Sequence, residues 1–186
     1  MKKKFSVLCL FALLVAAMTV FAPSASAAKV TAVKTATKWK KAKAVKVNKN
    51  YIVHGKNKNS AFGSYLKFKA KKKGTYRFSF SNFTVGDGNN RFGELYNICI
   101  CKPGKGSWEP ASLKVKTEGG KSNVLSCCDG VWDKQINTEP KPVTTVSDLP
   151  ARTAQLKLKK NQTVYIKVYQ TSTDAYTFNL QIKKVK

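Results

Sequence analysis

Acidic residues and histidine are scarce in this sequence. Only nine Asp and Glu residues stand against 35 Lys and Arg, which gives a formal net charge of +26, and His54 is the single histidine. Ser-His or Cys-His nucleophilic chemistry would therefore have to use His54, and a lone histidine at a strand end is more often structural. The positive charge favours polyanionic partners. The three arginines, Arg77, Arg91 and Arg152, stand far apart, so no arginine cluster indicates dedicated nucleic-acid binding.

Long apolar runs are also missing after the N-terminus. Residues 1–27 contain Met-Lys-Lys-Lys, an apolar run from Phe5 to Phe21 and the triplet Ala-Ser-Ala. These are the basic region, the apolar core and the small-residue cleavage site of a secretory signal peptide. We therefore expect cleavage after residue 27, no transmembrane segment in the mature chain, and a location that is secreted, extracellular or associated with the cell wall.

The remaining length suits a single domain. Lysine-rich residues 28–38 are interpreted as a flexible basic arm, with solubility and anion binding as its two alternative roles. Residues 39–186 are predicted to form one β-domain.

Alternation of apolar and polar residues dominates this domain. In residues 74–81, Tyr76, Phe78 and Phe80 share one face of an extended chain, while Arg77 and Ser79 share the other. The same pattern recurs at 66–68, 154–158, 164–168 and 176–182, and no segment after residue 27 shows an equally long helical period. Short half-buried strands separated by Lys-, Asn- and Gly-rich turns predict an all-β, antiparallel sandwich or barrel.

Two stretches resemble a known family. Residues 63–80 read Gly-Ser-Tyr-Leu-Lys-Phe-Lys-Ala-Lys-Lys-Lys-Gly-Thr-Tyr-Arg-Phe-Ser-Phe, and the run 39–83 around them resembles the opening strands of bacterial pre-peptidase C-terminal (PPC-like) domains. Residues 156–170 and 175–180 resemble the final hairpin of those domains. The resemblance implies a jelly-roll-like β-sandwich, of the kind found as an accessory or adhesive module on secreted bacterial proteins. Residues 94–150 depart from the family as a divergent, cysteine-bearing insert between the central strands.

The insert contains Cys99, Cys101, Cys127 and Cys128. If Ile98 and Ile100 face the core, Cys99 and Cys101 share the opposite face of one strand. We predict one or two disulfides that link this strand to a hairpin at 127/128, since exported proteins permit disulfides. Free thiols and a metal site are the alternatives, although C-x-C with C-C lacks the usual knuckle spacing of zinc sites.

Other chemistry has weaker signals, and no cofactor is predicted. Asp87, Asn89 and Asn90 offer oxygens for Ca²⁺, but a tight turn is the simpler interpretation. Glycosidase chemistry needs a pair of carboxylates, and spacing selects no pair among the candidates Glu94, Glu109, Glu118, Asp129 and Asp133.

Aromatic residues supply the best binding candidates. Trp108, Trp132 and Tyr96 lie in or near the insert, and Tyr165 and Tyr169 lie on the outer face of a strand. Such side chains stack on sugar rings, although a loop tryptophan can equally cap an open end of the sandwich.

Export, patterning, charge and resemblance together predict a secreted, non-catalytic, surface-associated binding or adhesion module. Its expected partner is a polysaccharide or an anionic cell-wall polymer. A cationic effector that acts on anionic membranes or polymers is the first alternative, and a small secreted hydrolase is the second.

Overall fold

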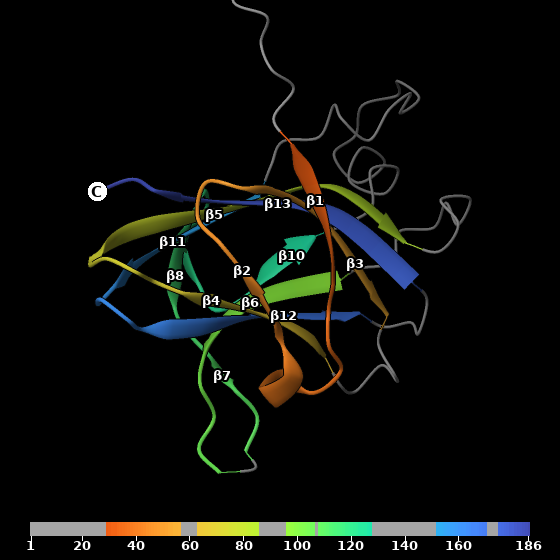
Figure 1. Cartoon of the computed structure of the whole chain (residues 1–186), viewed down its shortest axis with the longest axis horizontal. Coiled ribbons are helices and arrows are strands. Elements are labelled where there is room, and N and C mark those ends of the chain that lie inside the picture. Colours follow the sequence, from red (N-terminus) through yellow and green to blue (C-terminus); the bar gives the residue numbers. More distant parts are fainter. Residues whose placement is uncertain (1–28, 57–62, 86–95, 107, 128–151, 171–174) are drawn as a thin grey trace, which may run out of the picture.

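Two β-sheets form this protein in a computed structural model that describes residues 29–56, 63–85, 96–106, 108–127, 152–170 and 175–186. The seven-stranded sheet has the order β1 (Val30–Lys34), β3 (Asn50–Lys56), β13 (Ala175–Lys184), β5 (Gly74–Val85), β11 (Arg152–Leu158), β8 (Val115–Thr117) and β9 (Gly120–Ser122). The six-stranded sheet consists of β10 (Leu125–Cys127), β6 (Tyr96–Lys102), β12 (Thr163–Gln170), β4 (Ser64–Lys69) and β2 (Lys43–Val45) in that order, with β7 (Ala111–Ser112) beside β6. The predicted all-β sandwich is confirmed, with β5 and β13 above β4 and β12 in Figure 1.

Period-two alternation places the main core between the sheets. On β13, Tyr176, Phe178, Leu180 and Ile182 are all buried, and the residues between them are half-buried. The facing sheet contributes its own alternate residues, which are Leu66, Phe68, Ile98, Ile100, Val164, Ile166 and Val168. Burying such side chains stabilises the fold by about 1.5–3 kcal/mol each, so the pattern that predicts the strands also drives their packing.

Strand β5 changes its alternation near its end. The core positions Tyr76, Phe78 and Phe80 follow period two, but the next buried aromatic is Phe83. Asn82 has a φ of +53°, and the β5–β13 register shifts between Thr177 and Asn179. One extra residue on β5 therefore forms a bulge that returns Phe83 to the core.

A polar contact crosses the main core. The hydroxyl groups of Tyr176 on β13 and Ser64 on β4 hydrogen-bond to each other, and the Tyr176 hydroxyl also donates to Thr35 Oγ1 at 3.4 Å. The Tyr176 ring lies against Gly55, where a Cβ would approach the Tyr176 Cζ to 2.1 Å. Glycine at this position lets the ring reach the other sheet.

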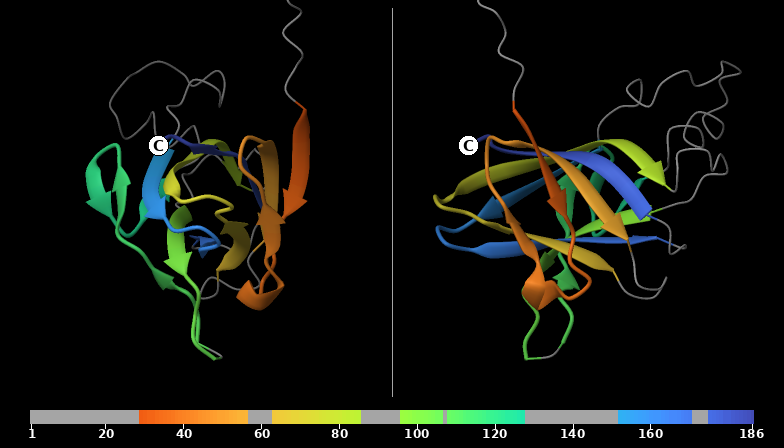
Figure 2. Two further views of the ribbon diagram at one scale, coloured as in Figure 1. Left: turned by 60° about the vertical axis from the view of Figure 1, so that its left-hand side comes forward. Right: turned by 45° about the vertical axis from the view of Figure 1, so that its right-hand side comes forward.

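The N-terminal segment corrects two expectations. Residues 30–34 of the expected flexible arm form β1, which pairs in parallel with β3, and β2 pairs in parallel with β4. The sandwich is therefore mixed at these edges rather than purely antiparallel. A lysine-rich edge strand is hard to recognise in a sequence, because backbone hydrogen bonds hold it while its side chains remain in solvent. Figure 2 shows β1 along the side of the sandwich.

The predicted insert, residues 94–150, contains strands of the two sheets. Strand β6 pairs with both β10 and β12, so residues 96–102 belong to the sandwich itself.

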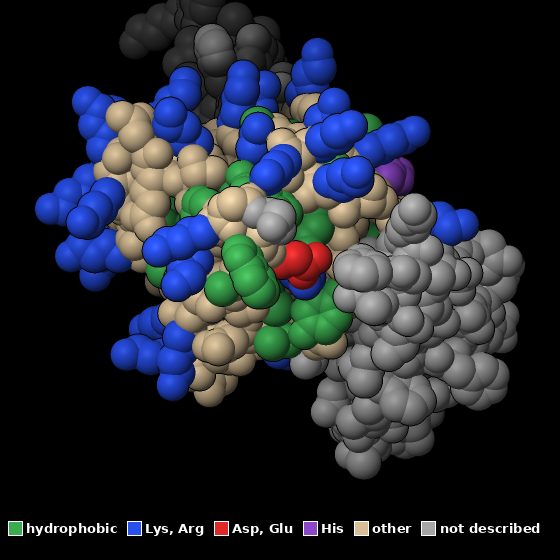
Figure 3. Space-filling model, turned by 90° about the horizontal axis from the view of Figure 1, so that it is seen from below, with side chains coloured by type: hydrophobic (Ala, Val, Ile, Leu, Met, Phe, Trp, Pro, Cys, Tyr) green, Lys and Arg blue, Asp and Glu red, His purple; other side chains and the backbone are tan. Residues whose placement is uncertain are grey.

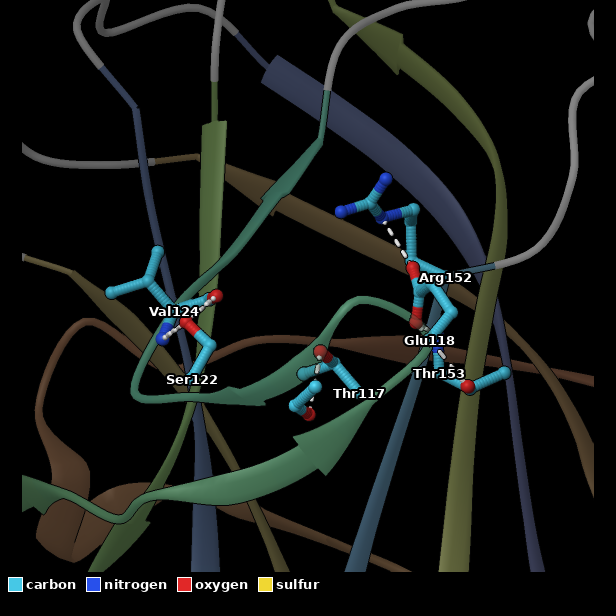
Figure 4. Close-up of polar contacts among 7 residues, drawn as sticks. Thr117, Glu118, Ser122, Val124, Arg152 and Thr153 are labelled. Atoms are coloured by element: carbon cyan, nitrogen blue, oxygen red, sulfur yellow. Dashed lines mark hydrogen bonds and ion pairs between the residues drawn. The ribbon is translucent and has the colours of Figure 1, made fainter.

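In the same region, Glu118 anchors the β8–β9 hairpin to β11 (Figure 4). Its carboxylate lies 2.7 Å from Arg152 Nε and accepts hydrogen bonds from the Thr153 backbone N–H at 3.1 Å and the Thr153 hydroxyl at 3.3 Å.

The predicted leader at residues 1–27 lies outside the described residues. Within the described part of the chain, no helix is long and apolar enough to cross a membrane.

Candidate functional site

The outer face of the six-stranded sheet has a second apolar cluster, which we call the aromatic face. Its buried members are Ala42, Tyr65, Cys99, Cys101 and Tyr165, and Trp39, Val124 and Tyr169 pack against them partly exposed. Strand register explains this arrangement, because Tyr165 lies opposite Cys101 on β6, and Lys167 lies between Cys99 on β6 and Tyr65 on β4. Three adjacent strands thus direct these outward positions to one surface.

The N-terminal segment covers part of the aromatic face. Trp39, in the 3-10 turn η1 (Trp39–Lys41), meets the Tyr165 ring edge-to-face with centroids 5.3 Å apart. The Ala36 backbone N–H donates to the Tyr65 carbonyl at 3.0 Å, and the Tyr65 N–H donates back to Ala36 at 2.8 Å. This cover leaves Tyr165 only 8% exposed. Tyr165, predicted as a ligand contact, is therefore mainly a packing residue.

A lysine and a glutamate add charge to the face. Lys167 Nζ lies 5.9 Å from the Tyr65 ring centroid, 5.7 Å from that of Tyr169 and 2.8 Å from Glu109 Oε2. Burial alone would raise the pKa of the Glu109 carboxyl, but the hydrogen bond and charge of Lys167 outweigh it and lower that pKa. Figure 3 views this side of the molecule and shows hydrophobic side chains around an acidic one, with Lys and Arg side chains farther out.

Tyr65 and Tyr169 differ in the surroundings of their hydroxyl groups. The Tyr65 hydroxyl is buried close to the Glu109 carboxylate. Burial raises the pKa of Tyr65, and the negative charge of Glu109 raises it further. Burial also raises the pKa of Tyr169, with Cys99 as the second cause. Both phenols are therefore neutral at ordinary pH, as hydrogen-bonding or stacking groups rather than as ionised bases.

Trp108 lies on the hairpin between β6 and β7, directly before Glu109. Its side chain is 79% exposed. Its backbone N–H donates to the Lys105 carbonyl at 3.0 Å, and its carbonyl oxygen would lie 1.9 Å from a Cβ at Gly104. Because the hairpin backbone approaches itself so closely at Gly104, the loop presents Trp108 to solvent from a fixed turn.

The predicted disulfide to Cys127 does not form. Cys99 and Cys101 are free, buried thiols, and the register pairs Cys127 with Tyr96. At about 3.3 Å per residue, Cys127 is displaced from Cys99 by about 10 Å along the strand, beyond the usual Cα separation of a disulfide. A disulfide would require Cys127 to lie opposite or beside Cys99 or Cys101, and β10 does not have that register. Cys128 lies outside the described residues.

Burial also changes the chemistry of the Cys101 thiol. Desolvation, with Cys99 as the next cause, raises the pKa of the Cys101 thiol to about 12. No three His, Cys, Asp or Glu side chains gather as a metal site within the described ranges.

The structure brings together some of the predicted binding residues. Tyr165 and Tyr169 share the aromatic face, and Trp108 precedes the Glu109 that pairs with Lys167 on that face. Tyr96 lies in β6, and its side chain is outside the described part. Trp132 and the Ca²⁺ candidates Asp87, Asn89 and Asn90 also lie outside the described residues.

Sequence reasoning missed Tyr65 and Trp39 as members of this face. The inward positions Leu66 and Phe68 implied that Tyr65 points outward, so strict alternation could have found it. Trp39 had no such signal, because a short turn brings it over the sheet.

The described carboxylates do not pair. Glu109 binds Lys167 on the six-stranded sheet, whereas Glu118 binds Arg152 on the seven-stranded sheet. His54 is exposed on β3.

The outer face of the seven-stranded sheet carries a groove of about 390 Å³ with a different lining. Its side chains are uncharged, and they are Val30, Asn50, Tyr51, Ile52, Ser79, Ser81, Asn179, Leu180 and Gln181. We call this surface the polar groove. Gln181 Nε2 donates to Asn50 Oδ1 at 2.5 Å within it.

Comparisons with known proteins identify no family. No family model matches the sequence, and no significant match is found among curated proteins. One matching structure contains the CBM22-1 and GH10 modules of endo-1,4-beta-D-xylanase 10B from Clostridium thermocellum, complexed with xylohexaose. The sequences are 11% identical, the TM-score is 0.30, and the match covers 69% of this chain and 20% of that chain. The chain thus spans about a fifth of the length of that protein.

Proposed function

We propose that this protein is an exported, non-catalytic binding module that is held at the bacterial surface and binds polysaccharide at the edge of the aromatic face. The observation that carries the proposal is the placement of Trp108. Trp108 is 79% exposed on a constrained turn, and it directly precedes Glu109, which forms an ion pair with Lys167. Exposed aromatic rings stack on the apolar faces of sugars, and adjacent polar groups hydrogen-bond to sugar hydroxyls.

Three features support a binding function that involves no catalytic step. The N-terminal 27 residues have the pattern of an export signal. The sandwich agrees with the accessory modules that the PPC-like resemblance implies. Both described carboxylates within the predicted insert, Glu109 and Glu118, form ion pairs with cations.

The test is binding of the purified full protein to a panel of neutral polysaccharides and to isolated cell walls, from about 50 to about 500 mM salt. We expect binding to a neutral polysaccharide that survives high salt. Trp108→Ala should weaken it about tenfold, the size of an ordinary hot-spot loss. Ile52→Ala is the matched control, because Ile52 is an exposed apolar residue on the opposite sheet. Retention of full affinity by Trp108→Ala would overturn the proposed site.

A cationic role is the second candidate, and the net charge of +26 favours it. Attraction by charge alone predicts binding to anionic polymers or membranes that disappears at high salt. It also predicts no difference between Trp108→Ala and Ile52→Ala.

A further inference from the structure

A second cavity, of about 550 Å³, lies at one end of the sandwich, away from the aromatic face. It is bordered by β2 and the turn after it, the end of β4, the β4–β5 turn and the end of β13, and its lining consists of Ala44, Val45, Lys46, Val47, Asn48, Lys49, Phe68, Lys69, Lys71, Lys72, Tyr76 and Lys184. We call it the lysine pocket. In Figure 1 the β4–β5 turn and the C-terminus both lie at the left-hand end of the molecule. The volume falls within the range of small-molecule sites.

The floor of the lysine pocket is apolar and held in place. Phe68 and Tyr76 belong to the main core and meet edge-to-face with centroids 5.1 Å apart. The Tyr76 hydroxyl donates to the Lys72 carbonyl at 2.7 Å, which fixes the β4–β5 turn over the floor. The backbone N–H of Asn48, a residue with a φ of +57°, donates to the Ile182 carbonyl at 2.8 Å and fixes the opposite wall. The cavity is therefore built into the fold before any ligand arrives.

The rim of the pocket is cationic, with no acidic residue. Six of the twelve lining residues are lysines, and none is Asp or Glu. Among the described residues these lysines have no ion-pair partner, since the described ion pairs use Lys167 and Arg152. Six like charges around one opening repel one another and produce a positive potential there. An anionic group at the rim would relieve that repulsion.

We infer that the lysine pocket binds a single-chain anionic amphiphile, a molecule with one alkyl or acyl chain and a carboxylate or phosphate head. The chain occupies the floor formed by Phe68, Tyr76 and Val47, and the head lies among the lysine ammonium groups. A simple polyanion would leave the apolar floor unused, and a neutral amphiphile would leave the lysine rim unused. Lysine stems suit such a site, because they cover apolar surface while their charged ends remain at the opening. This site is separate from the polysaccharide site of the proposed function.

Calorimetric titration of the full protein tests this inference with three probes. The probes are dodecyl phosphate below its micelle concentration, inorganic phosphate, and dodecyl maltoside below its micelle concentration. We expect dodecyl phosphate to bind at least about tenfold more tightly than either other probe, because only it uses both the floor and the rim.

Two charge variants locate the site. Lys69→Gln/Lys72→Gln removes two exposed rim lysines, and we expect it to weaken dodecyl phosphate binding at least about tenfold. Lys157→Gln/Lys183→Gln makes the same change in net charge at exposed positions of the seven-stranded sheet, and binding should stay within about threefold of the native protein. Circular dichroism of both variants checks that they fold. Val47→Phe partly fills the pocket and should weaken dodecyl phosphate while leaving inorganic phosphate unchanged.

Four outcomes would overturn the inference. If inorganic phosphate binds as tightly as dodecyl phosphate, the apolar floor does not contribute to binding. If dodecyl maltoside binds as tightly as dodecyl phosphate, the lysine rim does not contribute. An equal loss in both charge variants would indicate general charge attraction. Binding to phosphatidylglycerol vesicles without binding to monomeric dodecyl phosphate would assign the surface to a membrane instead.

Discussion

The two outer faces of this sandwich differ although both sheets follow the same period-two rule. On the seven-stranded sheet the outward positions include small polar residues, such as Ser79, Ser81 and Asn179, which line an open groove. On the six-stranded sheet the outward positions include Tyr65 and Tyr165, which are 1% and 8% exposed. The difference shows that an outward position becomes a second core when another segment of the chain covers it.

The covering segments come from two distant parts of the chain. Trp39 and Ala42 belong to the N-terminal segment, and Glu109 belongs to the β6–β7 hairpin. The polar groove, by contrast, is bordered at its edge by Val30 of β1 and is left open. The aromatic face is therefore packed at its centre, and the hairpin that carries the exposed Trp108 contacts it through Glu109.

The largest difference expected between the two outer faces is the loss of stability when an outward side chain is truncated to alanine. Tyr65→Ala should lower the free energy of unfolding by about 3–4 kcal/mol, because it leaves a cavity under the N-terminal cover. Ser79→Ala on the other face should change it by less than about 0.5 kcal/mol. Urea denaturation followed by circular dichroism measures both. Equal effects would contradict the view that the aromatic face is a second core.

The reactivity of the Cys101 thiol tests how well the aromatic face is covered. With a pKa of about 12, on the order of one Cys101 thiol in 10⁴ is ionised at about pH 8, and the thiolate is the reactive form. Iodoacetamide should therefore leave Cys101 unmodified in the folded protein and modify it fully in urea, as read by peptide mass mapping. Rapid modification in the native protein would mean that the cover over this face opens readily.

The ion pair of Glu109 and Lys167 has a smaller predicted effect. The pKa of the Glu109 carboxyl is lower in the folded protein than its usual value, so its stabilisation is present above the unfolded carboxyl pKa and is lost as pH falls through the folded one. Because Glu109 is 47% exposed, we expect Glu109→Gln to cost no more than about 0.5–1 kcal/mol near neutral pH.

Urea denaturation near neutral pH and again well below the usual carboxyl pKa measures this difference, which should vanish at the lower pH. A double-mutant cycle with Lys167→Gln isolates the pair from the packing of either side chain. A difference that persists in acid would assign the effect to packing of Glu109 and not to its charge.

The main-core strands could be predicted from the sequence because apolar and polar residues alternate along most of their length. Tyr76, Phe78 and Phe80 predicted β5, and Ile98 and Ile100 correctly placed Cys99 and Cys101 on the opposite face of β6. The edge strands were harder to predict from the sequence, because β1 is held by backbone hydrogen bonds to β3 rather than by an apolar face. Backbone pairing leaves little trace in side-chain composition.

Alternation and composition predicted the all-β architecture, the inward residues and the excess of positive charge, because both act locally along the chain. Three features followed only from the folded structure: Cys127 pairs with Tyr96, Trp39 covers Tyr165, and lysines from three separate segments surround one apolar cavity. These features depend on strand register and on which segments cross each sheet. Both are set by the packing of the whole chain, so no local pattern contains them.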